Sequence, residues 1–168
     1  MADALLHSTV KAEVARLYAD HFDLTTLIET GTGHAVLTQA AADYFDTVVT
    51  IEADLDAFTA SKALLEPYPN VTVHHGDSAA LLTEVLREVD EPCVIFLDAH
   101  EDIEGGTSAL AAEMKAVSVD RHDHVVLIDD VRLCNGWNGW ETPEGLKGYA
   151  DLWGYHFEVV DDIARLTP

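Results

Sequence analysis

A glycine-rich turn between an apolar run and a helix-like segment is the part of this sequence best suited to binding a cofactor. Residues 27–33 read Leu-Ile-Glu-Thr-Gly-Thr-Gly, so that Glu29 is followed closely by Gly31 and Gly33. Glycine lets a chain turn sharply after a strand and approach a ligand with its backbone, which a Cβ would obstruct. A second apolar run ends at Glu52, about 20 residues later, where nucleotide-binding βαβ units carry a ribose-binding acid. Together these features predict a nucleotide-cofactor site.

Acidic residues recur at the ends of the predicted strands. Ligands of an open parallel sheet collect beyond the carboxyl ends of its strands. Six acidic residues lie at or just after such ends: Glu29, Glu52, Asp77, Asp98, Asp129 and Asp130. Each one alone is about equally well explained as a helix cap or a turn residue, because Asp is common in both roles. Six in the same relative position favour a binding site.

Three of these positions suit one adenosine-containing ligand. Glu29, beside the glycine turn, would meet a cationic or hydrogen-bonding part of the cofactor, and Glu52 would accept both ribose hydroxyls. Gly76 would let the chain pass close to a base, and Asp77, followed by Ser78, would accept an exocyclic amine. The alternative for Asp77 is a cap of the helix that follows.

A second group consists of Asp98, His100, Asp129 and Asp130. Carboxylate oxygens converging from two strand ends suit Mg²⁺ or another hard divalent ion, and His100 would join them or act as a base. Without a metal, mutual repulsion would raise carboxyl pKa values, so convergence implies a bound cation or a proton. The alternative is that Asp130 caps a turn and His100 is solvated.

The remaining histidines and tryptophans carry weaker signals. A His pair beside a strand points to opposite faces, so we expect strand-edge or surface positions for His74, His75, His122 and His124. Trp137 and Trp140 lie in a glycine-containing loop. They form either a mobile aromatic wall over the site or anchors that pack the loop onto the body.

Alternating strand and helix patterns position these groups. Helices are expected at 2–21, 34–45, 55–66, 78–89, 107–117 and 144–153, and strands at 24–29, 47–52, 71–75, 93–97, 125–128, 155–160 and 163–167. In the first helix the apolar residues at helical spacing are Leu5, Leu6, Val10, Val14, Leu17 and Tyr18. The alternation predicts a parallel sheet with both faces covered. The last two strands are separated by two residues, which permits only a hairpin, so the final strand should be antiparallel.

Length and charge restrict the class of protein. We expect one domain over residues 1–168, with a leading helix within 1–22. The net charge of -22 would repel nucleic acid and anionic lipid, and suggests the hypothesis of a salt-adapted source. No apolar run is long enough to span a membrane and no signal peptide is visible, so we expect a cytoplasmic protein. Cys93 and Cys134 should be free thiols.

The chain resembles the class I S-adenosylmethionine-dependent methyltransferases over nearly its whole length. Residues 29–33 resemble their first motif, Glu52 their ribose-binding acid, and residues 76–78 their adenine-side motif. The resemblance implies a single-domain, Rossmann-like α/β sandwich of three layers. Its seven-stranded, mostly parallel sheet would have the order 3-2-1-4-5-7-6 with strand 7 antiparallel. The cofactor-binding residues implied are Glu29, Thr30, Gly31, Gly33, Glu52, Asp77, Ser78 and Asp98.

A narrower resemblance concerns the aspartates. The segments Leu97-Asp98-Ala99-His100 and Ile128-Asp129-Asp130 are similar to metal-dependent small-molecule O-methyltransferases. That likeness implies Mg²⁺ or another divalent ion on Asp98, Asp129 and Asp130, with Asp98 or His100 as the catalytic base. The first motif departs from the family pattern at its last positions, and long acceptor-covering insertions are lacking.

Three functions remain open at this point. The leading one is transfer of a methyl group to a hydroxyl of a small-molecule acceptor, with no nucleic-acid or membrane partner. A non-catalytic cofactor-binding or assembly module is the first alternative, and an NAD-dependent oxidoreductase the second. The closing strand pair fits the last of these poorly. A homodimer would be unsurprising, because a neighbouring subunit can cover an open site.

Overall fold

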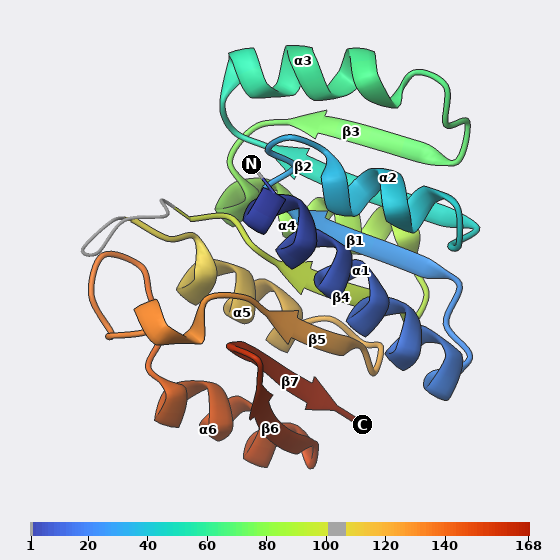
Figure 1. Ribbon diagram of the computed structural model, residues 1–168. Coiled ribbons are helices and arrows are strands. Elements are labelled where there is room, and N and C mark those ends of the chain that lie inside the picture. Colours follow the sequence, from blue (N-terminus) through green and yellow to red (C-terminus); the bar gives the residue numbers. More distant parts are fainter. Residues whose placement is uncertain (1, 101–106) are drawn as a thin grey trace.

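The computed structural model describes residues 2–100 and 107–168, and the side chains from residue 10 onward. Its centre is a seven-stranded sheet of order β3-β2-β1-β4-β5-β7-β6 (Figure 1). The strands are β1 (Thr26–Thr30), β2 (Thr47–Glu52), β3 (Val71–His75), β4 (Val94–Leu97), β5 (Val125–Ile128), β6 (His156–Val160) and β7 (Ile163–Thr167). Strand β7 pairs antiparallel with both β5 and β6, whereas the pairs among β1 to β5 are parallel. The expected order and the antiparallel final strand are confirmed.

Helices cover both faces of this sheet. They are α1 (Ala2–Phe22), α2 (Val36–Ala42), α3 (Leu55–Leu65), α4 (Ser78–Val89), α5 (Leu110–Ser118) and α6 (Pro143–Trp153), with a short 3₁₀ turn, η1 (Val131–Leu133). Because successive strand residues point to opposite faces, Phe96 of β4 packs in the core under α1 and α2. Its neighbours Ile95 and Leu97 pack in the core under α4, α5 and α6. The result is the expected three-layer sandwich (Figure 1).

The buried face of α1 differs from the one that the sequence predicts. Val10 and Leu17, expected in the apolar stripe, are exposed. Val14 of the same stripe is buried as expected, together with Ala15 and Ala19, which the stripe did not include. Lys11, one turn before Ala15, lies on the same buried face and is only 8% exposed. Packing on the sheet has therefore selected a face rich in small residues, which allows close approach, and has placed a lysine inside it.

Turns in this fold are made largely with aspartate. Five of the seven described non-glycine residues with positive φ are Asp, namely Asp23, Asp90, Asp130, Asp161 and Asp162. The last two form the predicted two-residue hairpin, for which two left-handed residues give the matching twist. Cys93 and Cys134 are free, as expected. Among the described helices, none combines the length and the apolar character needed to cross a bilayer.

Candidate functional site

The carboxyl ends of β1, β2, β3 and β4 surround one cavity of about 700 Å³. Its lining includes Gly31, Gly33, Glu52, Asp77, Ser78 and Asp98. These are six of the eight positions that the resemblance implies for the cofactor. At the other end the cavity reaches His100 and Ser108.

The glycine turn is shaped by close contact between two strand ends. Gly31 has a φ of +81° and donates its N–H to the carbonyl of Ile51. A Cβ at Gly31 would lie 2.5 Å from the carbonyl oxygen of Asp98, so no other residue fits without displacing backbone. At Gly33 a Cβ would meet nothing within 4 Å. The turn is therefore tight toward β4 and open near Gly33.

Glu52 is held rigidly at the cavity wall. Its Oε2 accepts the N–H of Gly33 at 2.8 Å, and its Oε1 accepts the N–H of Asp54 at 2.9 Å. Each oxygen keeps a further lone pair, so the carboxylate can accept two more hydrogen bonds from a ligand. Asp77 does cap α4, through the N–H of Ala79 at 2.9 Å, and it also lines the cavity. Asp77 can therefore serve both as the cap of α4 and as a contact for a ligand in the cavity.

Glu29 and Thr30 do not line the cavity. Glu29 is buried beneath it, where its Oε2 accepts hydroxyl hydrogen bonds from Thr38 at 2.5 Å and from Thr50 at 2.7 Å. Burial raises the pKa of Glu29 to about 8, although the two hydroxyl donors oppose this. The hydroxyl of Thr30 accepts the N–H of Asp98 at 3.2 Å. Their positions suit support of the turn rather than contact with a ligand.

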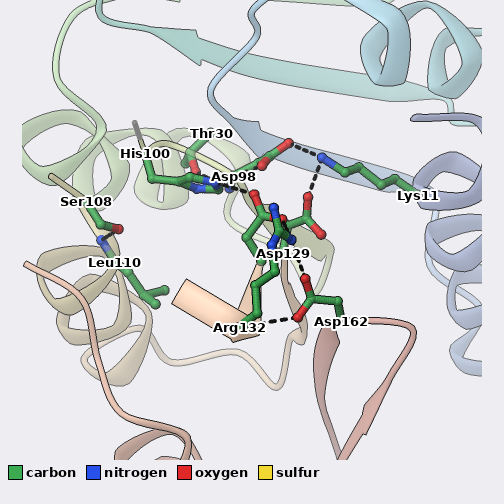
Figure 2. A network of polar contacts seen from close by, with 10 residues as sticks. Lys11, Thr30, Asp98, His100, Ser108, Leu110, Asp129, Arg132 and Asp162 are labelled. Atoms are coloured by element: carbon green, nitrogen blue, oxygen red, sulfur yellow. Dashed lines mark hydrogen bonds and ion pairs between the residues drawn. The ribbon is translucent and has the colours of Figure 1, made fainter. Parts of the chain in front are cut away.

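Asp98, Asp129 and Lys11 form an ionic group beyond the ends of β4 and β5, in which Lys11 and Asp129 are buried and Asp98 is half-buried (Figure 2). Lys11 reaches from α1 and places its Nζ 2.7 Å from Oδ2 of Asp98 and in an ion pair with Oδ2 of Asp129. Burial raises the pKa of Asp98 to about 6, with Asp129 adding to the rise and Lys11 opposing it. Burial alone would lower the pKa of Lys11, but the two carboxylates outweigh it and raise that pKa.

Asp130 belongs to a different set of contacts. Its Oδ2 lies 2.6 Å from Nε2 of His100, and its Oδ1 pairs with Arg132, which also pairs with Asp162. Burial opposes these contacts, but they lower the pKa of Asp130 to about 2. For His100 the burial effect is likewise outweighed, by Asp130, Asp98 and Asp129, so its pKa is raised. Figure 2 shows the polar contacts of this network.

The three predicted metal ligands do not share one point in space. Asp98 and Asp129 meet at the Lys11 ammonium, whereas both oxygens of Asp130 face other partners. A different trio, Asp98, His100 and Asp130, offers ligand atoms within 4.8 Å of one another. A metal there would have to replace the hydrogen bond between His100 and Asp130. The residues therefore do not fit a three-carboxylate metal site.

The two tryptophans of the loop have separate roles. Trp140 is buried, and its ring centroid lies 4.8 Å from that of His100. Trp137 is 76% exposed. The loop is attached near the cavity, because Ser108 donates its N–H to the carbonyl of Asn138. Trp140 is thus a fixed support of His100, and the alternative of an anchored loop holds for this residue.

His124, expected at a strand edge or on the surface, is buried. Its Nδ1 accepts the N–H of Cys93 at 3.3 Å, so its proton lies on Nε2, 3.1 Å from Oδ1 of Asp120. His122 also contacts Asp120, and the three side chains bring potential ligand atoms together. Because Nε2 of His124 carries the proton in this arrangement, that nitrogen is not a free metal ligand.

Comparison with models of known protein families assigns the chain to a family. Over residues 8–133 the sequence matches the model of the ribosomal RNA adenine dimethylase family. The chain belongs to this family. The match spans well over half of the chain and includes the glycine turn, Glu52, Asp77 and the strand-end aspartates. The sequence matches none of the curated proteins.

Solved structures share the fold of this ribosomal RNA adenine dimethylase family member. An O-methyltransferase from Bacillus cereus in complex with SAH has a TM-score of 0.64 at 18% identity, covering 95% of this chain and 81% of that one. The O-methyltransferase TomG from Streptomyces achromogenes, in complex with SAM, has 0.62 at 19%, covering 93% and 78%. The 23S rRNA methyltransferase ErmE has 0.56 at 16%, covering 92% and 67%. The chain thus has the class I S-adenosylmethionine-dependent methyltransferase fold.

Two features of this family member's site were missed in the sequence. Lys11, on α1, completes the ionic group with Asp98 and Asp129. The only sign of this role in the sequence is that Lys11 lies one turn before the buried residues Val14 and Ala15. Glu113 of α5 is 1% exposed. Burial raises its pKa to about 7, against hydrogen bonds from the side chains of Ser78 and Thr30. No local pattern marks Glu113, since the contact arises from packing of α5 on α4.

Proposed function

We propose that this chain binds S-adenosylmethionine and transfers its methyl group to a hydroxyl of a small-molecule acceptor. The observation that carries the proposal is one continuous cavity with two kinds of lining. One part is the glycine turn with Glu52, and the other contains Asp98 and His100. A cofactor site and a proton-accepting site are thereby adjacent, as methyl transfer requires.

The residues of the first part fit S-adenosylmethionine. Glu52 presents two fixed carboxylate oxygens to the cavity, which suits the two hydroxyls of a ribose. Asp77 and Ser78 would contact the adenine, and the open side of Gly33 leaves room for the remainder of the ligand. When bound, this cofactor supplies a methyl carbon on a sulfonium that is already activated. The acidic lining favours its positive charge over the neutral product, which would assist product release.

Asp98 is the proposed base. Its carboxyl lies at the cavity and has a pKa of about 6, so it is ionised at neutral pH and close to the range in which a base works best. His100 has a raised pKa and is hydrogen-bonded to Asp130, so it would be a poorer proton acceptor at the same pH. Its Nδ1 is 3.9 Å from Oδ1 of Asp98, a suitable place for orienting an acceptor.

Charge supports a small acceptor rather than a nucleic acid. Within the described part of the chain, at least six of the nine basic residues form ion pairs with carboxylates: Lys11, Arg16, Arg121, Arg132, Lys147 and Arg165. Phosphate binding relies on Lys and Arg that can release counterions from the nucleic acid. A chain with net charge -22 and most of its cations already paired is poorly equipped for that.

Methylation of an adenine amine in RNA is the second candidate, and the family match favours it. Its acceptor would also be positioned at Asp98 and His100. The two candidates differ in what must approach the cavity, because RNA brings a charged backbone to an acidic surface. RNA-directed activity should therefore require high salt or an additional cationic partner.

The test begins with calorimetric titration of S-adenosylmethionine, S-adenosylhomocysteine and NAD. We expect saturable binding of the two sulfur compounds, and a loss of about tenfold or more in Glu52→Ala, which removes a charged hydrogen-bond acceptor. Glu84→Ala, on the exposed face of α4, is the control. Binding of NAD alone would refute the proposal.

Transfer is then measured with tritiated methyl donor. One set of reactions contains phenols, catechols and sugars, and another contains adenine-bearing RNA hairpins. Label in a hydroxyl compound, reduced about 10²–10⁴-fold in Asp98→Asn, supports the proposal. Label in RNA alone would establish the second candidate. Tight cofactor binding without transfer to either set would favour a non-catalytic binding module.

A further inference from the structure

The ammonium of Lys11 lies where the two strand-end aspartates meet. It contacts Oδ2 of Asp98 at 2.7 Å and pairs with Oδ2 of Asp129, so one cation joins the ends of β4 and β5. The Lys11 side chain is 10% exposed and that of Asp129 fully buried. Figure 2 shows the lysine entering from α1, on the side away from His100 and Ser108.

A buried carboxylate, that of Asp129, and a half-buried one, that of Asp98, held this close together require a positive charge nearby. A divalent ion and an ammonium are alternative ways to supply it, because both compensate charge that is cut off from water. Hard divalent ions take six or more oxygen ligands in proteins, some of them from water. The Lys11 ammonium occupies the position between the two Oδ2 atoms where such an ion would bind, and like charges would repel each other there.

Asp130, the third acidic residue, cannot supply the missing ligands for a metal. Both oxygens of Asp130 are engaged, one with His100 at 2.6 Å and one with Arg132. The positive partners of the three aspartates therefore come from the chain itself. They are Lys11 for Asp98 and Asp129, and Arg132 with His100 for Asp130.

We propose that Lys11 is a built-in cation that takes the place of a divalent ion between Asp98 and Asp129. Removing its ammonium should then turn this pair into a divalent-metal site. Lys11 also holds Oδ2 of Asp98, which leaves Oδ1 for the acceptor. Lys11 is thus a positioning residue for the proposed base. The inference deepens the proposed function at the same site, but its test measures metal binding and needs no acceptor.

The test compares MnCl₂ and MgCl₂ titrations of wild type, Lys11→Met, Lys11→Arg and Arg16→Ala by calorimetry. Methionine keeps an unbranched stem of similar length without the charge, arginine keeps the charge, and Arg16→Ala removes a more exposed cation of the same helix. We expect one saturable Mn²⁺ site in Lys11→Met, at least tenfold tighter than any in the other three proteins. Adding Asp129→Asn to Lys11→Met should abolish it.

Two results would overturn the inference. One is a stoichiometric metal site in wild type that is lost in Asp98→Asn and in Asp129→Asn. The other is folded Lys11→Met with no gain in Mn²⁺ affinity. If Lys11→Met does not fold alone, recovery of its far-UV circular dichroism with Mn²⁺ supports the inference, and no recovery contradicts it.

Binding of S-adenosylmethionine in EDTA is measured on the same wild-type sample. Failure of that binding would count against the proposed function. It would leave the outcome of the metal titrations unaffected, so the two failures are distinguishable.

Discussion

The buried Glu29 should make this protein less stable as the pH rises from 5 to 8. Its carboxyl lies under the glycine turn, enclosed by β1, β2 and α2, with two hydroxyl donors on Oε2. Burial raises its pKa from 4.5 to about 8 in the folded state. Between these values the folded chain keeps a proton that the unfolded chain has lost, so raising the pH favours unfolding.

The size of the effect follows from this difference in bound protons. One proton corresponds to about 1.4 kcal/mol per pH unit, so the Glu29 contribution to stability should fall by about 2–3 kcal/mol between pH 5 and pH 7. Glu29→Gln removes the titration but keeps a carbonyl oxygen for Thr38 and Thr50. The variant should therefore match wild type near pH 5 and exceed its stability by that amount at pH 7.

The assay is urea unfolding at pH 5, 6, 7 and 8, followed by circular dichroism and extrapolated linearly to water. Glu84→Gln, which changes an exposed glutamate of α4, is the control and should follow wild type throughout. The stability difference between Glu29→Gln and wild type should grow with pH. A difference that is flat, or that shrinks with pH, would show that Glu29 is ionised in the folded protein.

The same variant tests whether Glu29 contacts the cofactor. Since Glu29 lies outside the cavity lining, the affinity of Glu29→Gln for S-adenosylmethionine should change less than about threefold. A loss as large as that of a missing charged hydrogen bond would indicate direct contact.

Three further predictions concern the cavity. Gly31→Ala should lose cofactor affinity and about 1–3 kcal/mol of stability, because position 31 has a positive φ and a Cβ there would contact the carbonyl of Asp98. Calorimetry measures the affinity and urea unfolding the stability. A variant that is unaffected in both would refute this geometry. Asp77→Ala should lower stability by about 1 kcal/mol through the lost cap of α4, measured by urea unfolding, whereas Asp77→Asn should recover most of it. Trp140→Ala should lower the free energy of unfolding by about 3–5 kcal/mol, because a large buried side chain is lost. It should also slow methyl transfer, because His100 loses the ring that it packs against. A variant with normal stability and a normal transfer rate would contradict this packing.

Much of the fold could be predicted because strand signals are local. Strands β2, β3, β5 and β7 have the bounds expected from their apolar runs and the polar residues that flank them. The hairpin followed from a loop too short for a crossover. Helix starts were less accurate, since α2 begins at Val36 rather than at residue 34 because Ala35 adopts a left-handed conformation as the chain leaves the glycine turn. The glycine turn imposes that conformation, and the helix propensities of the residues do not indicate it.

The site was predictable only in part, for a related reason. Residues at or just after strand ends, such as Glu52, Asp77 and Asp98, could be placed at one edge because topology alone brings those ends together. What each side chain contacts there depends on the other layers. The sequence indicated that converging aspartates need a cation, but the cation is Lys11 from a helix 87 residues before Asp98. The expectation that Val10 and Leu17 pack inward was wrong, and it hid the inward face that carries this lysine.

The aspartates with positive φ restrict how the charge of this protein can be edited. Solubility engineering would treat surface carboxylates such as Asp23, Asp90 and Asp161 as interchangeable with lysine, serine or alanine. At these positions the backbone is left-handed, which glycine, asparagine and aspartate tolerate and most other residues adopt only at a cost of about 1–2 kcal/mol. Neutralisation there should therefore proceed through asparagine. A charge-reversed library that ignores this would report backbone strain as if it were electrostatics.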